Sequence, residues 1–96
     1  FVQGIATSPA FRMAAPEADV IAMAGDGSYL MLNSELAAAA AMAVPFTVVV
    51  TDNRGFGCIN RLQMATGGAE FNNLLDHAAH ITPLHVDFAA HAASLG

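Results

Sequence analysis

Short apolar runs alternate with alanine-rich stretches along this chain. Residues 18–24 (Ala-Asp-Val-Ile-Ala-Met-Ala) are mostly apolar and end at Gly25, which is typical of a strand buried on both faces. Residues 46–51 form a second apolar run that is dense in β-branched side chains. Between the two runs, residues 30–43 are rich in Leu, Met and Ala, and they predict a helix that is packed on most sides and ends before Pro45.

A strand, a helix and a second buried strand predict a βαβ unit with parallel strands, which places the chain in the α/β class. Beyond this unit, the sequence predicts a turn-rich loop over 52–57, a short helix over 58–64 and a loop over 65–73. A further helix is expected after Asp87, whose side chain is placed to cap it. With 96 residues the chain forms at most one small domain.

The composition indicates that the chain is part of something larger. Its apolar fraction of 55% exceeds the globular average of about 45–50%, which predicts surfaces that other residues cover. The sequence also begins at Phe1 without a methionine and stops at Gly96 after an apolar helical stretch. We therefore expect residues 1–96 to be an incomplete domain of a longer polypeptide, called the parent protein below.

The charge and hydropathy of the chain argue against nucleic acid and membrane as partners. The net charge is −5 with three arginines as the cations, which argues against nucleic acid because its binding requires neutralisation of several phosphates. The longest apolar run, residues 36–50, contains Pro45 and falls short of the roughly 20 residues that span a bilayer. No secretion signal is apparent, and a single cysteine, Cys58, cannot form an internal disulfide. These features predict a cytoplasmic protein that binds neither nucleic acid nor membrane.

Polar residues follow both predicted strands. Asp26 comes just after the first strand and Asn53 just after the second, and parallel pairing brings both to the edge where open α/β sheets bind ligands. Gly25 and Gly27 permit a sharp turn and close approach of a ligand, while Ser28 and the start of the following helix offer donors to an anion. A carboxylate and an amide form part of an oxygen shell of the kind that Mg²⁺ accepts, completed by phosphate and water.

Gly-Asp-Gly and Asp-Asn are each common in ordinary turns, so neither alone predicts a site. Asn53 follows Asp26 by 27 positions, and the interval holds the helix and strand that return the chain to the same edge. In this combination the chain resembles the thiamine diphosphate enzymes, whose signature is Gly-Asp-Gly, a spacer of this size and a pair usually written Asn-Asn. The first member of that pair is here Asp52.

The resemblance implies a site for thiamine diphosphate and Mg²⁺. It implies that the metal ligands are the Asp26 carboxylate, the Asn53 side chain and the backbone carbonyl of Gly55. The residues that it implies for the diphosphate are Gly25, Asp26, Gly27 and Ser28. In this family an activating glutamate comes from a different domain, usually of a neighbouring subunit. The resemblance therefore implies an oligomeric parent protein and no catalytic residue in this chain.

Residues 25–32, 52–63 and 87–93 are similar to one group of family members in particular. These are hydrolases of inositol breakdown that cleave a carbon–carbon bond of a six-membered cyclic diketone to give a deoxyglucuronate. The resemblance implies this activity for the parent protein and none for the isolated chain. Two alternatives fit the same observations. One is an acetolactate synthase or 2-oxoacid decarboxylase with the same cofactor signature, and the other is a binding module without catalytic function.

The histidines, the cysteine and several apolar residues have simpler structural explanations. His77 and His80, three positions apart, have a spacing that metal sites use, but solvated histidines explain them more simply. Cys58 is expected to be a small buried side chain near the cofactor, because no histidine stands at a motif spacing to activate it. The expected core residues are Met31, Leu36 and Met42.

Overall fold

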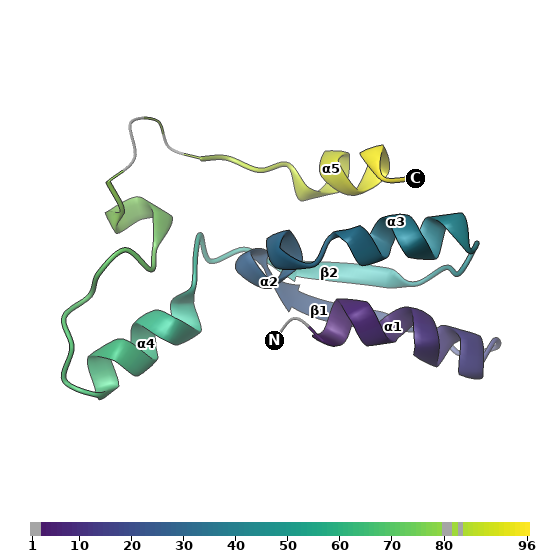
Figure 1. The fold of residues 1–96 in the computed structure, drawn as a ribbon, viewed down its shortest axis with the longest axis horizontal. Coiled ribbons are helices and arrows are strands. Elements are labelled where there is room, and N and C mark those ends of the chain that lie inside the picture. The colour runs from purple at the N-terminus through teal and green to yellow at the C-terminus, as the bar shows by residue number, and fades with distance from the viewer. Residues whose placement is uncertain (1–2, 80–81, 83) are drawn as a thin grey trace.

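The computed structural model describes residues 3–79, 82 and 84–96, which form two strands and several short helices (Figure 1). The elements in chain order are α1 (Gln3–Ala14), β1 (Ile21–Gly25), α2 (Asp26–Met31), α3 (Ser34–Ala41), β2 (Thr47–Thr51), α4 (Gly57–Ala65), the 3₁₀ turn η1 (Leu75–His77) and α5 (Phe88–Ser94). The α/β class is confirmed. The predicted helix over 58–64 is also confirmed, whereas α1 was not predicted.

The two strands pair in parallel, as the βαβ pattern predicts. The register runs from Ile21 opposite Thr47 to Gly25 opposite Thr51, so both strands end at the same edge of the sheet. Each strand is shorter than predicted at its start: β1 begins at residue 21 instead of 18, and β2 at residue 47 instead of 46. Both carboxyl ends, which position the polar residues discussed below, lie within one residue of the predicted place.

One face of this sheet is covered and the other is open. Ala22 and Ala24 are buried, and Ala24 packs in the core with Ile5 of α1. Ile21 and Met23 point to the opposite face and expose 64% and 71% of their surface. The expectation of a strand buried on both faces is therefore wrong for β1 within this chain, because no described helix covers the second face.

The single helix predicted over 30–43 is two helices, α2 and α3. The chain breaks at Leu32, whose backbone leaves helical geometry, and the Asn33 side-chain amide donates to the carbonyl of Leu30 at 3.0 Å. An asparagine that bonds locally to the backbone competes with helical hydrogen bonds in this way. Of the expected core residues, Leu36 packs against the core, but Met31 and Met42 are exposed, so that part of the prediction is wrong.

The end of α3 is a hydrogen-bonded cap. Ala43 takes a positive φ of 51° and its amide donates to the carbonyl of Ala40, while the amide of Val44 donates to that of Ala39. This is the paired bonding of a Schellman motif, with alanine in the position that glycine usually fills. Pro45 follows this cap and prevents the helix from continuing.

Tyr29 of α2 joins the sheet layer to α5. Its side chain is 1% exposed and meets the ring of Phe88 edge-on, with ring centroids 5.3 Å apart. The Tyr29 hydroxyl is hydrogen-bonded to Nδ1 of His91 at 3.0 Å, and burial raises the pKa of this phenol, which keeps it neutral. The predicted cap is confirmed: Asp87 accepts a hydrogen bond from the amide of Ala90 at 2.9 Å.

A polar network attaches residues 69–77 to α4. Asn60, which is buried, donates from Nδ2 to one carboxylate oxygen of Glu70 at 2.6 Å, and the other oxygen pairs with Nδ1 of His77 at 2.6 Å. The Asn73 side chain donates to Gln63 one turn along α4. These contacts place the segment beside the carboxyl edge of the sheet, away from the layer formed by α1 and α3 (Figure 1).

The chain is more extended than a compact domain of its length. Its radius of gyration is 15.6 Å, compared with about 13 Å for a compact domain of 100 residues. Within the described residues, none of the helices has the length and apolar character that crossing a membrane requires.

We predict that Tyr29→Ala lowers the free energy of unfolding of the parent protein by about 3–5 kcal/mol, because it removes a buried aromatic ring from the junction of α2 and α5. Tyr29→Phe is the matched control: it keeps the ring contact with Phe88 and loses only the hydrogen bonds of the hydroxyl to His91 and to the Phe88 carbonyl, at a cost of about 1 kcal/mol. Chemical denaturation measures both variants, and equal losses would contradict the importance of ring packing.

We also predict that acid loosens the contact between residues 69–77 and α4. The pKa of Glu70 is lowered from its ordinary value of 4.5, first by the hydrogen bond from Asn60 and then by that with His77. Its stabilising contribution is therefore present above pH 4.5 and is lost as the pH falls through the lowered pKa. Hydrogen exchange of the Phe56 and Leu75 amides, corrected for intrinsic rates, should accelerate over this range in the wild type. The increase should be absent in Glu70→Gln, and an unchanged pH dependence in that variant would contradict the prediction.

Candidate functional site

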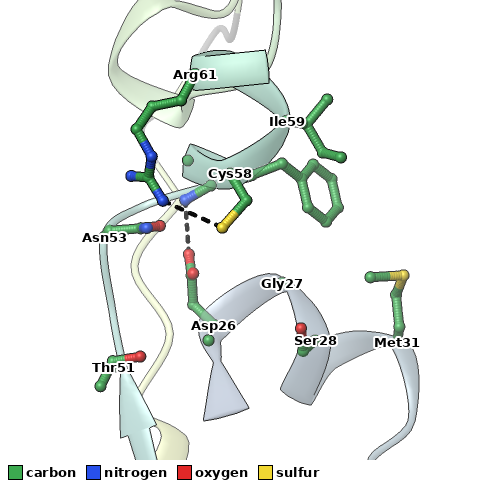
Figure 2. Close-up of a pocket in the computed structure, with 13 residues that line it drawn as sticks. Asp26, Gly27, Ser28, Met31, Thr51, Asn53, Cys58, Ile59 and Arg61 are labelled. Carbon is green, nitrogen blue, oxygen red and sulfur yellow. Dashed lines mark hydrogen bonds between the residues drawn. The ribbon is translucent and has the colours of Figure 1, made fainter. Parts of the chain in front are cut away.

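The candidate site lies at the carboxyl edge of the sheet, where the chain leaves β1 and β2 (Figure 2). Asp26 directly follows the last residue of β1, and Asn53 stands two residues after Thr51, the last residue of β2. Gly25 and Thr51 are themselves paired, so the parallel register delivers the two polar side chains to one place. The structure thus brings together the two residues on which the sequence interpretation depended.

Three groups from these two segments converge. Asp26, which is 5% exposed, accepts a hydrogen bond at Oδ2 from the backbone amide of Gly55 at 2.6 Å. One end of the Asn53 carboxamide lies 2.7 Å from the carbonyl oxygen of Gly55 and 3.2 Å from Oδ1 of Asp26. These are the three groups for which the family resemblance implies a metal-binding role.

The carboxamide can present either of its ends to this point. With the nitrogen inward, Asn53 donates to both neighbouring oxygens. With the oxygen inward, a carboxylate oxygen, an amide oxygen and a carbonyl oxygen face one another at 2.7 and 3.2 Å. Adjacent ligands of an octahedral Mg²⁺ with bonds of 2.0–2.1 Å are about 3 Å apart. The three oxygens therefore fit one side of such a coordination shell.

The charge of Asp26 has no ion-pair partner in the part of the chain that the structure describes. The two ion pairs found there are Arg54 with Asp76 and His77 with Glu70. A buried carboxylate is costly unless a counter-charge or several hydrogen bonds compensate it. The Gly55 amide and the amino end of α2 supply part of that compensation, and a divalent cation is suited to supply the rest.

Loop 52–56 holds its shape through local hydrogen bonds. The Asp52 carboxylate accepts from the amide of Arg54 at 2.8 Å, and Arg54 takes a positive φ of 58°. This is an Asx turn, which aspartate and asparagine both form. Aspartate in place of the usual first asparagine therefore leaves the loop and the position of Asn53 unaffected.

The carbonyl of Gly55 is positioned by a segment that sequence reasoning did not connect to the site. Gly55 forms an antiparallel bridge with Leu74 and takes a φ of 142°, which favours glycine. On either side of the bridge, the Phe56 amide donates to the carbonyl of Asn73 at 2.7 Å, and the Leu75 amide donates to that of Arg54 at 2.8 Å. No motif in residues 69–77 predicts this pairing, because it is formed by backbone hydrogen bonds.

A cavity of about 470 Å³ opens beside the converging oxygens. All six residues that the sequence predicts for the cofactor line it: Gly25, Asp26, Gly27, Ser28, Asn53 and Gly55. Cys58, which the sequence analysis expected near the cofactor, also lines the cavity. The remaining lining residues were not assigned to the site from the sequence. They are Met31, Thr51, Phe56, Gly57, Ile59 and Arg61. The volume and the mixture of apolar walls with a few polar groups are typical of small-molecule sites.

Cys58 lies at the surface of this cavity, so the expectation that it is buried is wrong. It stands in the first turn of α4, which projects away from the sheet, and its sulfur accepts a hydrogen bond from the Arg61 guanidinium at 3.1 Å. Figure 2 shows Cys58 and Arg61 on α4, across the cavity from Ser28 and Met31 on α2. The two short helices thus form facing walls.

Gly27 gives α2 and loop 52–56 room to approach each other. A Cβ atom at this position would lie 2.6 Å from the edge of the Phe56 ring, which is closer than real carbon contacts. The glycine therefore serves the internal packing of the site before any ligand is considered.

The histidine pair gains no support. His77 is engaged with Glu70, and His80 lies outside the described residues. Within residues 3–79, 82 and 84–96, no cluster of three or more His, Cys, Asp or Glu side chains is arranged to hold a metal. A metal at the sheet edge would instead depend on one carboxylate together with amide and carbonyl oxygens.

Comparison with known proteins supports the thiamine diphosphate interpretation. Residues 3–96 match the family described as thiamine pyrophosphate enzyme, C-terminal TPP binding domain. The chain is 43% identical over 91 residues to proteins named 3D-(3,5/4)-trihydroxycyclohexane-1,2-dione hydrolase in Bacillus thuringiensis (strain Al Hakam) and Bacillus cereus (strain 03BB102). A protein of the same name in Bacillus anthracis is 41% identical. Each alignment covers 88% of this chain and 14% of the relative.

The family match spans nearly the whole chain, and the relatives share more than two fifths of its aligned residues. The α/β fold with its parallel pair of strands agrees with that match. This chain belongs to the thiamine pyrophosphate enzymes and falls within their C-terminal cofactor-binding domain.

Proposed function

We propose that this chain holds the diphosphate and Mg²⁺ of thiamine diphosphate in a parent protein that hydrolyses 3D-(3,5/4)-trihydroxycyclohexane-1,2-dione, the substrate that the names of its relatives give. The observation that carries the binding role is the convergence of Asp26, Asn53 and Gly55 beside a cavity. The alignment with the hydrolases supports the substrate. Because the chain spans 14% of their length, the activity is proposed for the parent protein as a whole.

Each residue of the site has a distinct task in this proposal. The Asp26 carboxylate supplies negative charge to the metal, and the Asn53 amide and the Gly55 carbonyl supply neutral oxygens. Ser28 lines the same cavity, and its hydroxyl suits phosphate oxygens, as do the amides in the first turn of α2, which have no acceptor within the helix. Glycine at positions 25 and 27 keeps side chains out of the path of the diphosphate.

When bound, thiamine diphosphate supplies the nucleophilic carbon and the electron sink that break a bond next to a ketone. The residues of this chain bind and orient it. Asp26 is the single carboxylate among the described residues that line the cavity, and Glu70 is engaged by Asn60 and His77. The group that activates the aminopyrimidine ring is therefore assigned to another part of the parent protein, and residues 1–96 alone are expected to lack activity.

The proposal extends to a homo-oligomeric parent protein, which the family resemblance favours, and it keeps the predicted cytoplasmic location. The open face of the sheet, formed by Ile21, Met23 and Val49, supports the view that residues 1–96 are part of a larger domain. Exposed apolar surface of this kind is normally covered by other elements.

We predict that Asp26→Ala in the parent protein weakens Mg²⁺ and thiamine diphosphate together, because each is held partly through the other. The loss should exceed the roughly 10- to 100-fold that removal of an outer-shell partner costs. Calorimetric titration of cofactor at fixed Mg²⁺ measures it. The matched control is Asp52→Asn, which removes an exposed carboxylate and retains the Asx turn. Equal cofactor affinity in wild type and Asp26→Ala would contradict the assignment.

We predict that the parent protein opens the cyclic diketone and does not decarboxylate pyruvate. Product formation from each substrate, measured with the same preparation of enzyme, cofactor and Mg²⁺, distinguishes the two reactions. Turnover of pyruvate alone would favour the acetolactate synthase or decarboxylase alternative. Affinity for a nucleotide equal to that for thiamine diphosphate would favour a noncatalytic binding module.

A further inference from the structure

Gly57, the first residue of α4, lies against the Asn53 side chain. A Cβ atom on Gly57 would stand 2.6 Å from Nδ2 of Asn53 and 3.3 Å from Cγ. The first distance is shorter than any that real Cβ atoms show, so one of the two groups would have to move. Two other features decide which of them moves.

The backbone of Gly57 does not itself require glycine. The described glycines with positive φ are Gly55, Gly67 and Gly96, and Gly57 is not among them. Its position at the start of α4 is one where alanine is the better helix former. Glycine at position 57 is therefore unfavourable for the helix, and what it provides is space for Asn53.

The start of α4 is held more firmly than the Asn53 side chain. The Phe56 amide is bonded to the carbonyl of Asn73, and the Asn60 amide is bonded to the carbonyl of Phe56. The Asn60 side chain ties the same helix to Glu70. A methyl group on Gly57 would consequently displace the carboxamide, which turns on two single bonds, and move its other end away from Asp26 and Gly55.

We propose that Gly57 is a positioning residue for the metal: the absence of its side chain lets the Asn53 carboxamide reach the point where it meets Asp26 and the carbonyl of Gly55. This inference rests on the proposed function, because it assigns Gly57 a role through Asn53 as a metal ligand. It goes further in naming a residue that supplies no metal ligand and still sets the affinity for Mg²⁺ through Asn53.

Because Gly57 lies against Asn53, we expect Gly57→Ala to lower the affinity for Mg²⁺ without lowering the thermal midpoint. Affinity for Mg²⁺ at saturating thiamine diphosphate should fall about 10- to 100-fold, the range found when an outer-shell partner of a metal ligand is lost. The thermal midpoint without metal should be unchanged or higher, since alanine favours the helix. Gly4→Ala in α1 is the control for a glycine-to-alanine change, because a Cβ there meets only Met23 at an ordinary 3.7 Å.

The test is a double-mutant cycle in the full-length parent protein, with Mg²⁺ titrated by calorimetry into wild type, Gly57→Ala, Asn53→Ala and the double variant. If Gly57 acts through Asn53, Gly57→Ala weakens Mg²⁺ binding in the wild type and has no further effect once the carboxamide is gone. An equal loss in both backgrounds, or no loss in either, overturns the role of Gly57. If Asn53→Ala itself leaves Mg²⁺ affinity unchanged, the proposed metal site fails instead, so the two failures are distinguishable.

Discussion

Parallel pairing of β1 with β2 is the constraint on which the rest of the site depends. The last pair of the register, Gly25 with Thr51, fixes where both chains leave the sheet. Asp26 and Asn53 are distant in sequence and meet only because the intervening helices return the chain in the same direction. A shift of one residue in this register would separate the carboxylate from the amide by about 3.3 Å, which is enough to break the contact.

The burial of Asp26 determines the chemistry of the point where it meets Asn53. Asp26 is almost entirely removed from solvent, and its described neighbours are a backbone amide and a carboxamide, with no cationic side chain paired to it. A buried carboxylate without a counter-charge is unfavourable, and a bound cation compensates its charge. The two short helices α2 and α4 then enclose the space beside it, with an apolar ring and a thiol on the α4 side.

The parts of this arrangement that sequence could predict are those encoded in local patterns. The β-branched run of β2 and the cap at Asp87 are examples of local preferences that the structure follows. The division between α2 and α3 was missed because it depends on one competing bond from Asn33. The exposure of Ile21 and Met23 was missed because burial depends on neighbours that a single strand pattern does not specify. The pairing of Gly55 with Leu74 joins backbone groups, so it leaves no trace in residue type.

The open face of the sheet affects how a loss of cofactor binding should be interpreted. Two strands are too few for a sheet to be stable alone in water, and helices cover only one side of this one. The rigidity that keeps the Asn53 carboxamide 2.7 Å from the Gly55 carbonyl oxygen and 3.2 Å from Asp26 must therefore come partly from whatever packs against Ile21 and Met23. A substitution that disturbs the packing against Ile21 and Met23 would change no ligand residue. In a binding assay it would nevertheless weaken cofactor binding, as a substitution in the site itself would.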